Sequence, residues 1–207
     1  MVDITAIRDI PQARRVVEGV LYRHTLDWLR DYEARHGRQE YFGFWNGELW
    51  ASNFYPSTFK VEWGGSWVLN FDCNEQWFMF RKAWKFGDTE AMESLLQSGL
   101  QPSDYRDIGR SVRHFDAQAW AQVSDYYMLE GLVFKFTQNP ELAQALIDSG
   151  GRVLVECSPV DRIWGVGIAR KCDGGEDDSV WRDSRNWRGD NRMGFRLMDL
   201  RDALLNR

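Results

Sequence analysis

The spacing of apolar residues predicts an amphipathic helix at the amino end of the chain, from about Ala13 to His36. Apolar side chains recur there at intervals of three and four residues, at Val16, Val17, Val20, Leu21, Leu26, Trp28 and Leu29. The polar stretch His36–Gln39, which contains a glycine, ends this pattern. Because no linker-like composition follows, we expect residues 1–40 to form an amino-terminal helical extension packed on a domain of residues 41–207.

Beyond Tyr41 the pattern changes to short strands and turns, followed by helices. Residues Tyr41–Phe59 combine aromatic side chains with Gly, Asn, Ser and Pro, a composition typical of strands and turns. Further strands are predicted at Ser66–Phe71 and Arg152–Glu156. Strands and helices do not alternate regularly, so we expect the fold class α+β, with a single, mostly helical domain and a few short strands.

Two helices of this domain have recognisable starts. Asp72 or Asn74 could cap a helix that runs through Phe86, because both side chains accept hydrogen bonds from free backbone amides. Proline is favoured at the first position of a helix, so the pair Asn139-Pro140 predicts the start of another.

Two charged residues lie on an apolar face of the helix that begins near Asn74. Glu75 and Lys82 share this face with Phe78 and Met79, and the two charges are roughly 10 Å apart along the helix axis. Buried charges must be paired, neutralised or used in function. Two interpretations stay open: structural ion pairs with other elements, which the pattern alone favours, or a pair that acts in chemistry.

A second segment, Leu154–Gly167, takes a strand into a turn and presents Asp161 and then Trp164. Carboxylates at strand ends beside an aromatic ring suit acid–base chemistry on a stacked ligand. The alternative is that Asp161 only caps a short helix.

A third segment, Trp187–Asn191, contains Gly189 and leads into the last predicted helix, which runs to Leu204. A glycine-containing turn at the start of a helix can bind phosphate through free backbone amides. The alternative is an ordinary capped helix.

Aromatic residues are abundant, with 11 Trp, 7 Tyr and 12 Phe, and several tryptophans lie beside Gly, Asn or Asp. Such rings are well placed to line a cleft and stack on a flat ligand, although for any single tryptophan a core position at a strand end is the favoured interpretation. Lys and Arg number 26 against 31 Asp and Glu, a net charge of −5. The chain therefore lacks the basic field of a non-specific nucleic-acid binder, which leaves only a local, transient contact with nucleic acid.

The cysteines Cys73, Cys157 and Cys172 form no CxxC pair, and the three histidines are scattered. This spacing predicts neither a disulfide framework nor a metal site, and we expect no cofactor. The amino terminus has no apolar core of a secretory signal, and no apolar run approaches the length of a membrane span. We therefore expect a cytoplasmic protein without a membrane partner.

Several of these segments belong to a larger set that resembles the NADAR-domain family, also called YbiA-like. The matching stretches run in the family's order from about Tyr41 to the carboxyl end. They are Leu49–Pro56, Glu75–Ala83 with Phe86–Asp88, Gly109–Val112 with Phe115, Asp116 and Trp120, Lys135–Pro140, Leu154–Gly167, and Trp187–Gly194 with Leu197, Met198 and Arg201. The chain differs from the family's common pattern at Trp77 and Phe78, where the family often has Tyr or Met. These aromatic side chains could change the substrate more than the type of reaction.

The resemblance implies an N-glycosidase that cleaves the bond between C1 of a ribose and a nitrogen. Its substrate would be ADP-ribose on guanine, in a nucleotide or in nucleic acid, or a phosphoribosyl aminopyrimidine intermediate of riboflavin synthesis. By similarity, Glu75, Lys82, Trp120, Asp161 and Trp164 fall on the family's active-site positions. Two other classes of function stay open: a non-catalytic module that binds ADP-ribose or a nucleotide, and a structural protein that interacts through its aromatic surface.

We assign catalytic roles to Glu75, Lys82 and Asp161. The two carboxylates would stabilise positive charge at C1 and assist the leaving base, in an order that the sequence does not fix. Lys82 would either hold a phosphate or a carboxylate, or attack C1 as a neutral amine. The predicted substrate-binding residues are Asn53, Arg110, Trp120, Glu156, Trp164, Trp187, Gly189 and Asn191.

Overall fold

A computed structural model describes residues 7–20, 22–175 and 177–206 of the chain. Its internal contacts divide these residues into two compact units. The hairpin unit comprises residues 7–19 and 53–143, and the parallel unit comprises the described residues of 20–52 and 144–206. Each unit is named here for the pair of strands that it contains.

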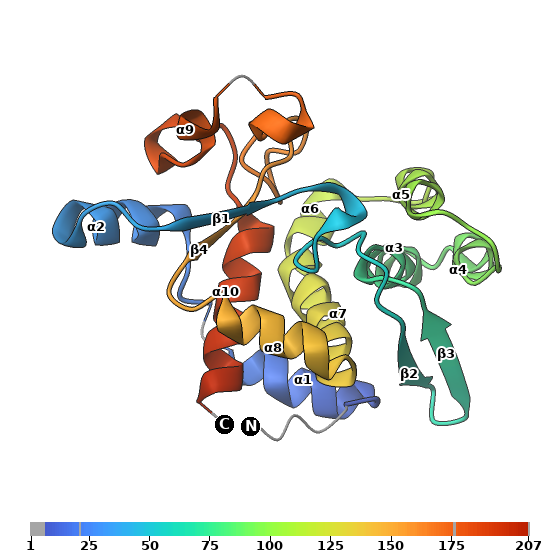
Figure 1. Cartoon of the computed structure of the whole chain (residues 1–207). Helices are drawn as coiled ribbons and strands as arrows, with labels where there is room; N and C mark the ends of the chain where they lie inside the picture. Colours follow the sequence, from blue (N-terminus) through green and yellow to red (C-terminus); the bar gives the residue numbers. More distant parts are fainter. Residues whose placement is uncertain (1–6, 21, 176, 207) are drawn as a thin grey trace. The chain divides into compact units, whose positions relative to one another are not determined.

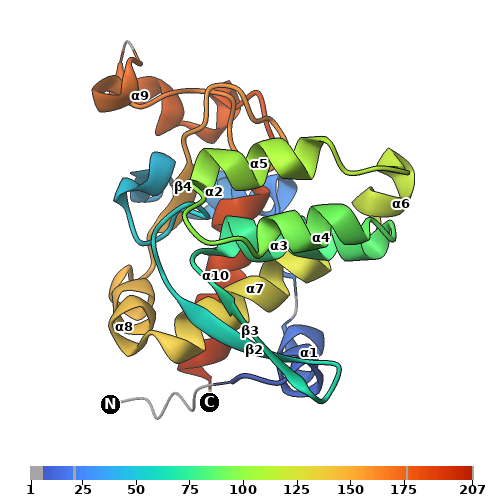
Figure 2. The same ribbon diagram turned by 90° about the vertical axis from the view of Figure 1, so that its right-hand side faces the viewer.

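The hairpin unit is built around helix α3, which contacts helices α4, α5 and α7 (Figure 2). An antiparallel pair of strands packs beside it, with Phe59 opposite Phe71 and Trp63 opposite Trp67. The elements of this unit are α1 (Ile10–Gly19), β2 (Phe59–Trp63), β3 (Trp67–Phe71), α3 (Asn74–Lys85), α4 (Thr89–Leu95), α5 (Pro102–Arg110), α6 (Ala117–Ala121) and α7 (Ser124–Gln138).

The parallel unit pairs strand β1 with strand β4, and helix α10 packs against β4 (Figure 1). Helix α8 (Pro140–Asp148) carries the chain from the hairpin unit into this unit. The unit contains α2 (Leu26–His36), β1 (Tyr41–Phe44), β4 (Val153–Glu156), α9 (Asp178–Trp181), α10 (Arg192–Leu205) and the 3₁₀ turns η1 (Asn46–Glu48), η2 (Lys171–Asp173) and η3 (Ser184–Asn186).

This arrangement confirms the α+β class, mostly helical with a few short strands. Strands at residues 67–71 and 153–156 and a helix that starts at Pro140 are also found as predicted. Within the described residues, no helix is long and apolar enough to cross a membrane.

The predicted continuous helix Ala13–His36 is wrong, because the chain forms α1 and α2 with a break between them. The backbone amides of Arg23 and His24 donate to the Asp199 carboxylate of α10, and Thr25 then caps α2 through the Trp28 amide at 3.1 Å. These bonds fix a non-helical segment at residues 22–25, where apolar periodicity alone favours a helix. A long-range contact therefore overrides the local pattern.

The predicted cap of α3 by Asp72 or Asn74 is also wrong. The N-cap is Cys73, whose side chain makes no capping hydrogen bond, and Asn74 is the first residue of the helix and fully buried. Instead, Gln76 reaches back and its Oε1 accepts the Asp72 amide at 2.6 Å. The Asn74 side chain is thereby left for other partners.

A buried ion pair links α3 to α7 inside the hairpin unit. Arg81 Nε lies 3.1 Å from Glu130 Oε2, and both side chains are almost inaccessible to solvent. Aromatic rings surround the guanidinium, at 4.1 Å for Tyr127 and 4.5 Å for Trp84. Burial raises the pKa of Glu130 to about 7 even though the Arg81 charge opposes the shift. This pair fixes α3 against α7.

Candidate active site

Glu75 lies in the first turn of α3 and is held by Asn53 through two hydrogen bonds. Asn53 Nδ2 donates to Glu75 Oε2 at 2.6 Å, and the Glu75 amide donates to the Asn53 carbonyl at 3.0 Å. Both side chains are 7% exposed, so the carboxylate is nearly desolvated. A charged group in this setting is electrostatically stronger than the same group in water.

Lys82 lies two helical turns further along α3 and is half-buried. Its Nζ donates to the Gly109 carbonyl at 2.7 Å and lies 4.0 Å from the centre of the Phe115 ring. Among the described residues, no carboxylate is within ion-pair distance of this amine. Burial lowers the pKa of Lys82, the Arg110 charge adds to the decrease, and Glu75 opposes it. The structural ion pair that the sequence left open for Lys82 is therefore not formed in this part of the chain.

Gly109 explains how α5 approaches the lysine so closely. A Cβ atom at this position would lie 1.9 Å from the Met79 sulfur, so only glycine lets the two helices pack at this point. The same close approach brings the Gly109 carbonyl to Lys82. Arg110 follows directly, but its side chain is 70% exposed and lies 3.8 Å from Asp107.

Aromatic rings border the Lys82 face of α3. Trp120 is partly exposed and lies 5.0 Å from Phe78 and 6.0 Å from Tyr127, measured between ring centres. Phe78, at one of the positions where the chain departs from the family pattern, thus contacts a predicted substrate-binding residue. Trp77, at the other position, is fully buried between Phe71 and Phe134 and belongs to the core.

In the parallel unit, Asp161 organises the turn that follows β4. Its Oδ1 accepts the backbone amides of Ile163 and Trp164, each at 2.8 Å, and its own amide donates to Ser158 Oγ at 3.1 Å. The carboxylate accepts amides as a helix cap does, but residues 161–167 form bends and no helix, so the short helix of the alternative is not formed. Asp161 and Trp164 both stay partly exposed, so the carboxylate is accessible from solvent as well.

The start of α10 is tied to the Asp161 turn by backbone hydrogen bonds. The amides of Arg192 and Met193 donate to the carbonyls of Ile163 and Trp164, at 3.2 and 3.1 Å. Gly189 permits this contact, since a Cβ there would lie 2.3 Å from the Gly165 carbonyl. The amides of Asp190, Asn191, Arg192 and Met193, which we expected to be free for phosphate, are therefore already used inside the protein.

Asn191 and Trp187, two predicted substrate-binding residues, are buried in the parallel unit. Asn191 is fully buried, and its amide donates to the Leu154 carbonyl at 2.9 Å and accepts the Glu156 amide at 3.0 Å. Trp187 is 6% exposed and donates its indole N–H to the Trp181 carbonyl at 2.7 Å. These contacts favour structural roles for both residues, while the Glu156 side chain stays partly exposed.

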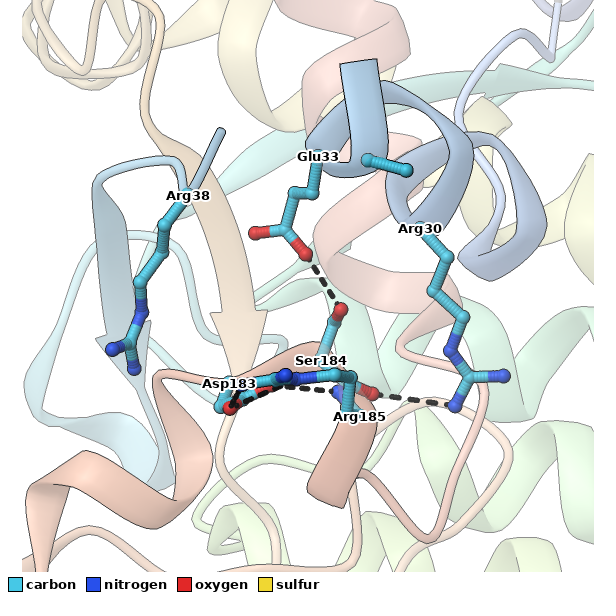
Figure 3. Close-up of a pocket in the computed structure, with 7 residues that line it drawn as sticks. Arg30, Glu33, Arg38, Asp183, Ser184 and Arg185 are labelled. Carbon is cyan, nitrogen blue, oxygen red and sulfur yellow. Dashed lines mark hydrogen bonds and ion pairs between the residues drawn. The ribbon is translucent and has the colours of Figure 1, made fainter. Parts of the chain in front are cut away.

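The parallel unit also contains a hollow of about 320 Å³ beside helix α2 (Figure 3). Most of its charged groups already have partners: Glu33 accepts a hydrogen bond from Ser184 Oγ at 2.7 Å, and Asp183 pairs with Arg185. Arg30 donates to the Ser184 carbonyl at 3.3 Å. None of the predicted site residues lines this hollow, and we do not assign the reaction to it. Its lining residues are Arg30, Glu33, Ala34, Arg38, Asp183, Ser184 and Arg185.

The structure thus groups the predicted residues by unit. In the hairpin unit, α3 carries Glu75 and Lys82, Asn53 contacts Glu75, and Trp120 packs on Phe78 of the same helix. Asp161, Trp164, Gly189, Asn191 and the Glu156 backbone form a second connected group in the parallel unit. No cluster of three or more His, Cys, Asp or Glu side chains suited to a metal occurs in the described part of the chain.

Sequence reasoning missed three residues that shape the Glu75 and Lys82 face: Asn74, Gly109 and Gly131. The sequence indicates Asn74 only as a possible cap and Gly109 only as part of the segment Gly109–Val112, and it gives no signal for Gly131. A Cβ at Gly131 would lie 1.9 Å from Asn74 Oδ1 and 2.3 Å from Trp77 Cδ1, so this glycine makes room for both side chains. Only a tertiary contact reveals such a role, because each glycine lies inside a regular helix.

Comparison with known proteins places this geometry in a family. A model described as the NADAR domain matches residues 41–205. Protein irg-1 of Caenorhabditis elegans is 33% identical over 79% of this chain and 79% of that protein. N-glycosidase R617 of Acanthamoeba polyphaga mimivirus is 31% identical over 73% of this chain and 85% of that protein. The NMR structure of Escherichia coli YbiA, at 24% identity, has the same fold with a TM-score of 0.60, over 82% of this chain and 87% of that one. Since the family model spans most of the sequence, the chain belongs to the NADAR domain family.

Proposed function

We propose that this protein is an N-glycosidase, a hydrolase that cleaves the bond between C1 of a ribose and a nitrogen of the attached base. The observation that carries the proposal is a buried Glu75 carboxylate and a half-buried Lys82 amine on one helix of a NADAR domain. Two similar proteins, R617 and Escherichia coli YbiA, are named N-glycosidases, which supports the class of reaction.

The proposed substrates are two kinds of ribosylated base. One is ADP-ribose on guanine, in a nucleotide or in nucleic acid, and the other is a phosphoribosyl aminopyrimidine intermediate of riboflavin synthesis. Both carry a ribose joined to nitrogen through C1, so one reaction serves both. The net charge of −5 favours recognition of a single modified base over binding of a long nucleic-acid backbone.

A carboxylate is the group that this reaction requires most. Breaking the C1–nitrogen bond builds positive charge on C1 and the ring oxygen, and a nearby anion stabilises that charge. Glu75 is desolvated and held by Asn53, which suits it either to this stabilisation or to proton transfer to the leaving base. Asp161 is the second proposed carboxylate, and its contribution is tested separately below.

Lys82 has the environment of an amine that reacts as a nucleophile. Burial lowers its pKa, and a carbonyl rather than a carboxylate accepts its hydrogen bond. In the covalent route, neutral Nζ attacks C1, the base leaves with a proton, the ribose ring opens to an imine, and water releases the sugar. In the alternative route, Lys82 only orders a phosphate or a carboxylate while water attacks C1.

The deciding experiment is a paired hydrolysis assay, followed by liquid chromatography and mass spectrometry. One reaction contains ADP-ribosylated guanine, as nucleotide and in DNA, and the other contains the phosphoribosyl aminopyrimidine. Release of ADP-ribose identifies the first substrate class, and release of ribose 5-phosphate identifies the second. Lys82→Ala and Asp161→Ala are expected to lose this activity, and Glu93→Gln, on the exposed surface of α4, is the matched control.

Borohydride separates the two routes for Lys82. Reduction during turnover fixes an imine as a stable adduct, so the covalent route predicts a mass increase on the peptide that contains Lys82. An unmodified peptide under conditions of active turnover would contradict this route and leave the ordering role.

The competing function is a module that binds ADP-ribose or a nucleotide without cleaving it. Such a module raises the melting temperature with ligand by mass action, yet releases no product. Ligand-dependent stabilisation without turnover on either substrate would therefore replace the N-glycosidase proposal. Neither stabilisation nor turnover would favour a structural or interaction role.

A further inference from the structure

Three side chains form a continuous path from helix α7 to the Glu75 carboxylate. Asn74 Nδ2 donates to Asn53 Oδ1 at 2.6 Å, and Asn53 Nδ2 donates to Glu75 Oε2, also at 2.6 Å. Behind Asn74 lies Gly131 of α7, where any side chain would collide with Asn74 Oδ1. Asn74 is fully buried, and Asn53 and Glu75 are 7% exposed.

The chemistry of the carboxylate fixes the orientation of both amides. An ionised carboxylate can only accept, so Asn53 must present Nδ2 to Glu75 and turn Oδ1 away. That oxygen requires a donor, which Asn74 supplies through its own Nδ2. Reversing either amide would place two acceptors against each other. Only this orientation of the two amides pairs a donor with an acceptor in both hydrogen bonds.

This arrangement leaves Asn74 with an unsatisfied atom. Its Nδ2 also contacts the Met128 sulfur at 3.3 Å, but Oδ1 has no hydrogen-bond partner among the described residues. An orphaned buried carbonyl oxygen destabilises a fold, so an asparagine in this place does not serve stability alone. The unsatisfied oxygen belongs to Asn74, the residue whose Nδ2 donates to Asn53.

We propose that Asn74 is a positioning residue: through Asn53 it fixes the donor that orients Glu75, and Gly131 provides the space that Asn74 needs. This inference rests on the proposed function, because it gives Glu75 its role in cleaving the ribose–nitrogen bond. It also revises the predicted role of Asn53, whose side chain serves Glu75 rather than a phosphate or ribose.

Substitutions at Asn74 test the proposal through the pH profile. In Asn74→Leu the side-chain amide of Asn53 loses its fixed orientation. In Asn74→Asp the Asn53 side chain lies between two carboxylates, which both accept hydrogen bonds. Either change lets Glu75 bind a proton more readily. We expect kcat/KM to fall roughly 10- to 100-fold, the effect of one hydrogen bond to a charged group. The limb of the profile that reports Glu75 should move up by about one pH unit.

Gly131→Ala should shift the same limb in the same direction, because its Cβ pushes on Asn74 Oδ1. Leu129→Ala, a fully buried position on the same helix, is the matched control for lost stability. It should lower the melting temperature without moving the limb. Folded Asn74→Leu and Gly131→Ala proteins with the limb of the wild type would overturn the proposal, and Asn74→Ser gives a smaller replacement if Asn74→Leu does not fold.

A measurement without substrate separates this inference from the proposed function. The carboxyl carbon of Glu75, followed by ¹³C NMR and assigned with Glu75→Gln, reports protonation directly. A titration displaced to higher pH in Asn74→Leu supports the positioning role even if the wild type hydrolyses neither substrate. An unchanged titration contradicts it, even if the wild type is an active N-glycosidase.

Discussion

The two units hold their candidate carboxylates by different means. In the hairpin unit, Glu75 is nearly buried and a side-chain amide, that of Asn53, donates to it. In the parallel unit, Asp161 is partly exposed and two backbone amides of its own turn donate to it. The Asp161 carboxylate helps to build the loop around it, whereas the Glu75 carboxylate accepts from Asn53, a residue 22 positions away in the sequence.

This difference means that the same substitution has different consequences in the two units. Removing the Glu75 carboxylate removes a nearly buried charge that accepts a hydrogen bond from Asn53. Removing the Asp161 carboxylate also removes a cap from the turn that contacts the start of α10. Loss of activity alone therefore identifies a chemical role for Glu75 but does not distinguish a chemical from a structural role for Asp161.

The largest expected effect follows from Glu75→Gln. Glutamine has almost the same shape and keeps an oxygen that can accept from Asn53, while the charge is lost. We expect kcat/KM to fall about 10²- to 10⁴-fold, the usual contribution of a positioned acid or base, with little change in melting temperature. The paired hydrolysis assay and thermal denaturation measure the two quantities. Near-normal turnover would show that the preformed setting around Glu75 does not serve the reaction.

A smaller effect, and the sharper comparison, comes from Asp161→Asn beside Asp161→Ala. Asparagine keeps an oxygen for the amides of Ile163 and Trp164, so only the alanine variant should lose a cap, with about 0.5–2 kcal/mol less stability. If Asp161 acts through its charge, both variants lose roughly 10²-fold or more in kcat/KM. Restoration of activity in Asp161→Asn would assign a capping role. Asp177, a similar cap at the start of α9, is the control position, where alanine should leave turnover unchanged.

The smallest expected effect concerns Glu130, a buried carboxylate of the hairpin unit that forms an ion pair with Arg81. Its pKa of about 7 lies above the usual value of a glutamate, because burial disfavours the charged form. The folded state therefore binds this proton more tightly than the unfolded state. The contribution of the protonated Glu130 to the free energy of unfolding is fully present below about pH 4.5, and it is lost as the pH rises through 7.

Melting curves of the wild type and Glu130→Gln between pH 4.5 and 8 measure this contribution. The wild type should lose on the order of 5 °C relative to the variant as the pH rises. Parallel curves would contradict a raised pKa in Glu130. Asp88 provides the opposite case, because the hydrogen bond from Arg113 lowers its pKa to about 2. The stability that the ionised Asp88 gives the fold is lost only as the pH falls below about 4.

Local patterns were sufficient where a short segment contains its own signal. The proline at the start of α8 and the run of apolar residues in β4 each act within a few residues, and each element forms as its pattern indicates. The amphipathic pattern at the amino end predicts one helix and is wrong, because a contact distant in the sequence decides the structure there. Asp199, more than 170 residues away, binds the backbone of Arg23 and His24 and separates α1 from α2.

For the candidate site, the sequence by itself determined the chemistry on offer: a glutamate and a lysine on one helical face, an aspartate after a strand, and the segments typical of a NADAR domain. Only the tertiary structure decided which groups have partners. It showed that Asn53 and Asn74 orient Glu75, that Gly109 brings a carbonyl to Lys82, and that the amides at the start of α10 are already used. The physical reason is that the periodicity of a helix fixes which face a residue occupies. The donor that meets its side chain comes from elements remote in the sequence, whose approach is set by packing.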